Sequence, residues 1–124
     1  MWLIKNFRGA LAAIAIGLIA QPAGAHPSVK STNPAMDGVN SIPPTQIELN
    51  FSEDVIAKFS GLELRDEKSE KITTGVATTD PKDKKRLVVP ILGSLVPGRY
   101  TVKWHVVSTD THRVEGKYSF SVKR

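Results

Sequence analysis

The 124-residue chain contains no cysteine, and aromatic residues make up only 6% of it. Without cysteine, disulfide bonds and thiolate metal sites are excluded, so the fold must be stable through its core alone. Met36 is the only methionine after Ala25, and one thioether cannot form a soft metal site of several sulfurs. No second hydrophobic segment follows Ala25.

The apolar run of the chain lies near its start, at residues 10–20, and is preceded by Lys5 and Arg8. Eleven residues are too few to cross a hydrocarbon core of about 30 Å as a helix. Ala23 and Ala25 supply the small side chains of an A-x-A cleavage site. The pattern therefore predicts a cleaved secretory signal peptide over residues 1–25; a retained anchor or a buried helix is the alternative. Cleavage after Ala25 would make His26 the first residue of the mature protein.

The remaining 99 residues, 26–124, suit one domain with one core. Removal of residues 1–25 would take two of the seventeen basic residues and none of the twelve acidic ones, so the net charge would fall from +5 to +3. The basic surplus is scattered, and its only run, 82–86, lacks interleaved aromatic residues. We interpret this run as a solvated loop and expect no nucleic-acid partner.

Five segments are strand candidates, 45–52, 60–66, 85–92, 98–108 and 116–124, and polar and apolar residues alternate in all of them except 85–92. In the fourth segment one face carries Tyr100, Val102, Trp104 and Val106. Pro90 favours an edge strand or a bulge, and Gly116 and proline pairs indicate turns. No helical stripe follows Ala25. The sequence predicts an all-β fold, an antiparallel sandwich with one buried face per sheet.

The chain has three histidines, and their positions differ in kind. Alternation places His105 on the solvent side of its strand, with Thr101 and Lys103. His112 follows Asp110 by two residues, at the strand end and bend before the last strand. In a locally extended segment both side chains would project to the same side. The pair is either part of a metal site or a hydrogen bond that braces a turn.

A histidine at a free N-terminus offers two nitrogens, the α-amine and Nδ1, which close a six-membered chelate ring. His112 would add an imidazole and Asp110 an oxygen. Such a nitrogen-rich set favours Cu(II), although tetrahedral Zn(II) is an alternative. Pro27 has no amide proton for copper to displace, so a metal at His26 would take its other ligands from the folded domain.

Five stretches carry a family resemblance: AHPSVKSTNPAMDGVN, IELNFSEDV, FSGLEL, PGRYTVKWHVVSTDTHRVEG and YSFSV. Together they resemble the CopC family of periplasmic copper-binding proteins over nearly all of residues 26–124. The resemblance implies an immunoglobulin-like Greek-key β-sandwich or barrel of about seven antiparallel strands. It also implies a Cu(II) site at His26, Asp110 and His112. Glu53 matches the glutamate of the F-S-E motif, and we expect it beside the metal at most, otherwise exposed in a turn.

Segment 65–86 departs from the family pattern, because it lacks the methionines and histidines of the Cu(I)-binding loop found in other members. We therefore expect the protein to bind Cu(II) only. The predicted signal peptide and the resemblance imply the periplasm, and we also expect a monomer. The resemblance implies a CopD-type inner-membrane copper permease as its partner.

The expected function is sequestration, trafficking or homeostasis of copper, without catalysis. One alternative is a copper mono-oxygenase with a histidine brace; 99 residues leave little room for a substrate face, and a carboxylate in the remaining equatorial position would disfavour oxygen activation. The other is a metal-free immunoglobulin-like interaction module.

Overall fold

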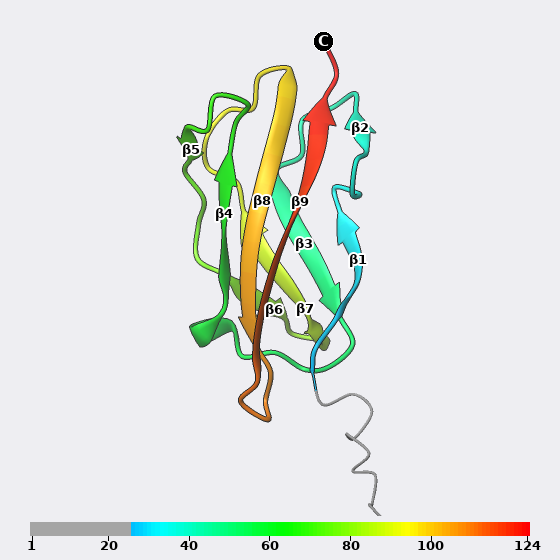
Figure 1. Cartoon of the computed structure of the whole chain (residues 1–124), viewed down its shortest axis with the longest axis vertical. Coiled ribbons are helices and arrows are strands. Elements are labelled where there is room, and N and C mark those ends of the chain that lie inside the picture. Colours follow the sequence, from blue (N-terminus) through cyan, green and yellow to red (C-terminus); the bar gives the residue numbers. More distant parts are fainter. Residues whose placement is uncertain (1–25) are drawn as a thin grey trace, which may run out of the picture.

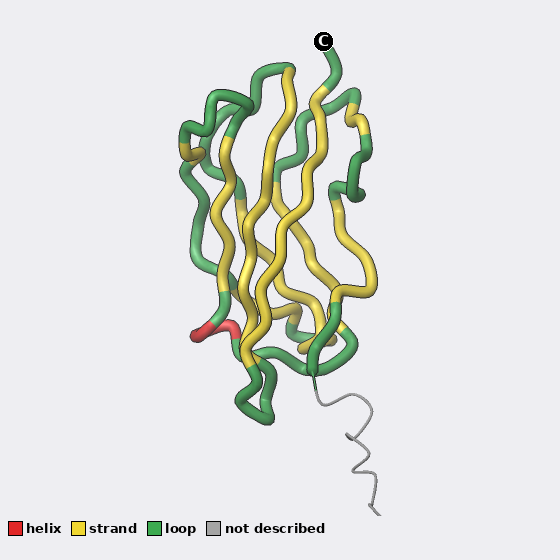
Figure 2. Tube along the Cα trace, in the orientation of Figure 1, coloured by secondary structure: helices red, strands yellow, loops and turns green. Residues whose placement is uncertain are grey.

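The computed structural model of the protein describes residues 26–124 (Figures 1 and 2). The predicted signal peptide, residues 1–25, lies outside the described residues. Within residues 26–124 no helix combines the length and apolar character needed to span a bilayer.

Two β-sheets form the fold. The four-stranded sheet has the order β1 (Val29–Asn33), β3 (Gln46–Phe51), β7 (Asp83–Pro90) and β6 (Thr78–Asp80). The five-stranded sheet has the order β2 (Val39–Asn40), β9 (Arg113–Val122), β8 (Gly98–Val107), β4 (Gly61–Arg65) and β5 (Lys71–Ile72). One 3-10 helix, η1 (Ala57–Phe59), precedes β4.

The predicted all-β sandwich is confirmed. The described residues form nine strands rather than about seven: six strands of five to ten residues, and three short strands of two or three residues at the sheet edges. The pairing is antiparallel except between β2 and β9, which run parallel.

The core lies between the sheets and consists of the inward-facing strand residues together with Val55 and Leu95 from the connecting segments. Its buried residues are Ile47, Leu49, Phe51, Val55, Leu64, Leu87, Val89, Leu95, Tyr100, Val102, Val106, Tyr118, Phe120 and Val122. Burying an aliphatic or aromatic side chain of this size contributes roughly 1.5–3 kcal/mol, which explains why a domain without cysteine can hold its shape. Burial raises the pKa of the Tyr118 hydroxyl to about 12.

Gly116 does not mark a turn, so that prediction was wrong. It lies inside β9, opposite Trp104 of β8, and the turn between these strands is 108–112. A Cβ atom at Gly116 would lie 2.6 Å from Cζ2 of Trp104. The Trp104 ring covers this glycine and meets Phe51 edge-on, with ring centroids 5.3 Å apart. Trp104 is only partly buried. The glycine makes room for a ring.

Pro90 is the last residue of β7, a central strand rather than an edge strand. The Pro90 position nevertheless suits proline, because β6 reaches only as far as the pair between Thr78 and Val88. Beyond that point β7 pairs with β3 alone, through Pro90 and Gln46. The missing N–H therefore removes no bond between β6 and β7.

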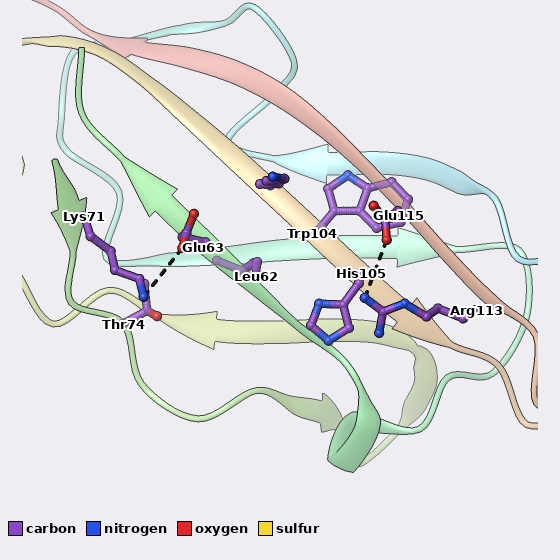
Figure 3. Close-up of a pocket in the computed structure, with 9 residues that line it drawn as sticks. Leu62, Glu63, Lys71, Thr74, Trp104, His105, Arg113 and Glu115 are labelled. Carbon is purple, nitrogen blue, oxygen red and sulfur yellow. Dashed lines mark ion pairs between the residues drawn. The ribbon is translucent and has the colours of Figure 1, made fainter. Parts of the chain in front are cut away.

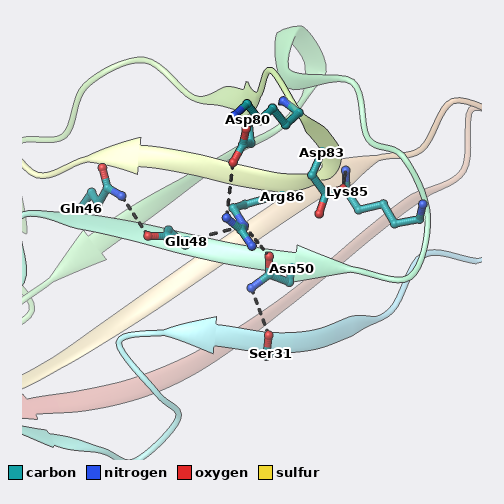
Figure 4. A network of polar contacts seen from close by, with 9 residues as sticks. Ser31, Gln46, Glu48, Asn50, Asp80, Asp83, Lys85 and Arg86 are labelled. Carbon is teal, nitrogen blue, oxygen red and sulfur yellow. Dashed lines mark hydrogen bonds and ion pairs between the residues drawn. The ribbon is translucent and has the colours of Figure 1, made fainter.

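The basic run 82–86 is not a solvated loop: its last four residues begin β7, and Arg86 is the centre of a polar network on the outer face of the four-stranded sheet (Figure 4). The Arg86 Nε donates to Asn50 Oδ1 at 2.9 Å, and its guanidinium lies 3.3 Å from Asp80 and 3.9 Å from Glu48. Asn50 in turn donates to Ser31 of β1. The network joins all four strands of this sheet.

The chain enters β1 at the same end of the sandwich as the loop between β8 and β9, and the C-terminus lies at the opposite end (Figure 1). This arrangement brings His26, just ahead of β1, to the loop that carries Asp110 and His112.

Candidate metal centre

The five-residue loop 108–112 connects β8 to β9 and is held by backbone hydrogen bonds. The N–H of Ser108 donates to the carbonyl of His112 at 2.9 Å, and that of Thr111 donates to the carbonyl of Ser108 at 2.8 Å. Thr111 has a φ of 70°, in the left-handed region. Asp110 and His112 therefore occupy a tight turn. The locally extended segment considered for them was wrong, although their side chains do converge.

The convergence is direct: Nδ1 of His112 lies 3.1 Å from Oδ1 of Asp110. This separation lacks the alignment of a hydrogen bond, and the buried Nδ1 has no hydrogen-bond partner within residues 26–124. The Ser108 hydroxyl donates to the same Oδ1 of Asp110. This hydrogen bond, followed by the nearby His112 imidazole, lowers the pKa of the Asp110 carboxyl.

His26 joins the pair from the other end of the chain. Its ring meets the ring of His112 edge-on, with centroids 4.8 Å apart and an interplanar angle of 78°. Two pairwise contacts through His112 thus link the three residues that the sequence singled out. No group of three His, Cys, Asp or Glu side chains in the described part of the chain is already closed around a metal position.

Glu53 is half-buried, so the alternative that it is exposed in a turn was wrong. Its Oε2 is buried and has no hydrogen-bond partner among the described residues. The following residue, Asp54, accepts a backbone hydrogen bond from Thr109 at 3.2 Å. Glu53 therefore belongs to a segment attached to the 108–112 loop, and the structure gives it no hydrogen bond or ion pair to His26, Asp110 or His112 within that part of the chain.

Comparison with known proteins identifies the family of this chain. The model of the CopC domain family matches residues 29–123. The chain belongs to the CopC family.

Relatives of this CopC-family chain include Protein YobA of Escherichia coli K12, which is 42% identical over 119 residues, 96% of each chain. Copper resistance protein C of Pseudomonas syringae pv. tomato is 34% identical over 111 residues, 86% of this chain and 87% of its own. The crystal structure of PcoC, a methionine-rich copper resistance protein from Escherichia coli, superposes with a TM-score of 0.70 at 38% identity, and covers 80% of this chain and 100% of its own.

The third histidine of the CopC-family chain is elsewhere. His105 lies on the outer face of the five-stranded sheet, as alternation predicted, and pairs across strands with Gly61 and Glu115. It is half-buried and lines an open groove of about 420 Å³ together with Glu63 and Arg113 (Figure 3). Burial, and then the charge of Arg113, lowers the pKa of His105. None of the three predicted ligands lines this groove, so cavity size does not locate the candidate metal centre.

Sequence reasoning about the site missed Ser108. It is fully buried, and its hydroxyl contacts Asp110. A signal was present, because the alternation that points Val106 inward also points Ser108 inward. A polar residue on a buried face needs a partner, and here the partner is a predicted ligand.

Proposed function

We propose that the protein, matured to begin at His26, is a periplasmic Cu(II)-binding protein that serves copper sequestration, trafficking or homeostasis. One observation carries the proposal: the edge-on contact between His26 and His112, with Asp110 3.1 Å from the same imidazole. These side chains supply two imidazoles and a carboxylate at one end of a rigid sandwich. The α-amine that cleavage would free at His26 adds a third nitrogen.

The donor set suits Cu(II) on chemical grounds. Nitrogen and oxygen donors in a tetragonal arrangement favour Cu(II), which also has the highest affinity in the divalent series. The buried Nδ1 of His112 has no hydrogen-bond partner within residues 26–124, which supports its role as a donor to a metal. Pro27 has no amide proton to lose, so copper at His26 cannot capture the next backbone nitrogen.

Relatives named for copper resistance support copper as the metal. A difference from one of these relatives supports Cu(II) rather than Cu(I) as the form that is bound. PcoC is described as methionine-rich, whereas this chain has only Met36 after residue 25. Met36 is half-exposed, and one thioether is not the soft, multi-sulfur set that Cu(I) prefers. We infer a single Cu(II) site and no methionine-rich Cu(I) site.

Glu53 is proposed as a neighbour of this site rather than a ligand. Its buried carboxylate oxygen lacks a hydrogen-bond partner in the described structure, and its segment is tied to the ligand loop through Asp54 and Thr109. A carboxylate in this position would raise the basicity of a nearby donor or accept its proton.

Binding without catalysis fits the geometry better than a histidine-brace mono-oxygenase. Asp110 lies beside His112, where its carboxylate would fill an equatorial position on copper and disfavour oxygen activation. We propose that a monomer carries the metal to or from a membrane protein of the CopD copper-permease type.

The test of this function is Cu(II) titration of protein that starts at His26, verified by intact mass. We expect one tight site per molecule and an electron paramagnetic resonance spectrum with nitrogen hyperfine structure. Adding one glycine before His26 should weaken binding more than about 100-fold, beyond the usual effect of groups that do not touch the metal, because the amine leaves the chelate.

The glycine-extended protein should fold like the parent, because the extension touches no core residue. A loss of affinity in this protein therefore cannot be ascribed to misfolding. Equal affinity of the two forms would contradict the bidentate role of His26. Two tight Cu(II) sites, or tight binding of Cu(I), would contradict the single-site proposal.

A further inference from the structure

Ser108 is a fully buried polar residue at the end of β8. Its backbone forms an isolated bridge with Val55, so the residue is fixed between the sheet and the segment that follows β3. Burying a hydroxyl is unfavourable unless it finds a hydrogen-bond partner. The partners of Ser108 therefore indicate why a polar side chain is kept there.

All of the side-chain partners of Ser108 are in the loop that carries two proposed ligands. The hydroxyl donates to Oδ1 of Asp110 and lies 3.4 Å from the carbonyl oxygen of His112. A hydroxyl has one proton, and a hydrogen bond to a carboxylate is stronger than one to a neutral carbonyl. The Ser108 hydroxyl therefore donates its hydrogen bond to the Asp110 carboxylate rather than to the His112 carbonyl.

The backbone of Ser108 holds the loop independently of the hydroxyl. Its N–H donates to His112 at 2.9 Å, and its carbonyl accepts from Thr111 at 2.8 Å. These bonds do not need the side chain. Removing only the hydroxyl should free the Asp110 carboxylate while the turn itself remains.

We propose that Ser108 is a positioning residue for the copper site, whose buried hydroxyl holds the Asp110 carboxylate beside the His112 imidazole before the metal arrives. The inference rests on the proposed function, in which Asp110 and His112 bind copper. The Asp110 side chain is 45% exposed, so without this bond it would sample several rotamers and would have to be ordered on binding. Ser108 acts on the metal through Asp110 and does not touch it.

The test substitutes Ser108→Ala and Ser108→Thr in the protein that starts at His26. Partners of this kind typically change metal affinity roughly 10- to 100-fold, so the alanine variant should lose about that much Cu(II) affinity with an unchanged stoichiometry of one. Threonine keeps the hydroxyl and should restore most of the affinity. The copper hyperfine parameters of the alanine variant should also change.

A matched control is Ser60→Ala. The Ser60 hydroxyl accepts from the N–H of Val107 at 3.1 Å and donates to Ile56 at 2.7 Å, at the same end of β8, but it does not contact Asp110. This variant should lose stability without losing copper affinity. In an Asp110→Ala background, Ser108→Ala should have no further effect on affinity, because the group that Ser108 positions is gone.

A second readout needs no metal. In the apoprotein, χ1 couplings of Asp110 measured by nuclear magnetic resonance should report one rotamer in the parent and averaging in Ser108→Ala. If the parent binds Cu(II) tightly and Ser108→Ala matches it in affinity and in Asp110 couplings, the positioning role is overturned and the proposed function stands. If the parent itself fails to bind Cu(II), both are overturned.

Discussion

The three histidines of the chain have different surroundings. His26 and His112 meet at one end of the sandwich, whereas His105 lies on the outer face of the five-stranded sheet. A ligand that is lost cannot be replaced by a residue on another face. The contribution of each histidine to copper binding can therefore be separated by substitution.

We predict that His112→Ala weakens Cu(II) binding by more than about 100-fold, because it removes the imidazole that both His26 and Asp110 contact. His105→Ala should leave the affinity within about twofold of the parent. A competition titration against a chelator of known affinity measures both. A strong loss in His105→Ala, or none in His112→Ala, would mean that the donor set is wrong.

His105 affects how the folding stability of the domain depends on pH. Its lowered pKa, caused by burial and by Arg113, means that the unfolded chain takes up this proton at a higher pH than the folded domain. Stability is therefore lost as the pH falls through the ordinary histidine range near 6.5. The charge of Glu115 opposes this shift.

We predict that His105→Gln reduces this acid-dependent loss of stability. Urea-unfolding midpoints of the metal-free parent and variant, at about pH 7.5 and about pH 5.5, give the comparison. The variant should show the smaller difference between the two pH values. Equal differences would mean that His105 titrates alike in both states.

Part of the candidate site could be read from the sequence, and part could not. The two-residue spacing of Asp110 and His112 predicted their convergence, although the left-handed Thr111 makes it a turn rather than an extended segment. The contact between His26 and His112 depends on which strand ends share one end of the sandwich. Local patterns carry no such information; metal-ligand chemistry made His26 a candidate partner of His112, and the family resemblance implied the same pairing.

At the scale of elements, the β8–β9 hairpin combines the longest strands with the ligand loop. Alternation predicted the core faces of β3, β4, β8 and β9 because each is long enough to display a period of two. The strands β2 and β5 have two residues each, too few for any period. Gly116 was read as a turn because its reason lies across the strand, in the Trp104 ring.

We predict that Gly116→Ala destabilises the domain by roughly 1–3 kcal/mol, as overpacking does, because the new Cβ would meet two Trp104 ring atoms at 2.6 and 2.9 Å. The matched control is Gly61→Ala on β4, whose Cβ would meet only His105, at 3.5 Å. That change should be neutral or slightly stabilising, since alanine costs less conformational entropy than glycine. Urea unfolding measures both, and equal effects would contradict the role of the ring.

At the scale of the whole molecule, the candidate metal centre joins the entry to β1 with the loop between the last two strands. Strand β1 belongs to the four-stranded sheet, and β8 and β9 belong to the five-stranded sheet. A copper ion bound by His26, Asp110 and His112 would connect both sheets at one end of the sandwich. Such a ligand set is brought together in the folded state only, so binding free energy becomes folding free energy.

We predict that Cu(II) raises the thermal unfolding midpoint of the protein that starts at His26. A free ligand at about 100 times its Kd adds roughly 2.7 kcal/mol, which for a domain of about 100 residues is a shift on the order of 10 °C. Circular dichroism of the strands, with and without copper, measures the shift, and a chelator should reverse it. The glycine-extended and His112→Ala proteins should unfold near the metal-free parent and respond much less to copper, because each lacks one connection across the sheets. An unchanged midpoint of the parent at saturating copper would mean that the metal does not hold the two sheets together.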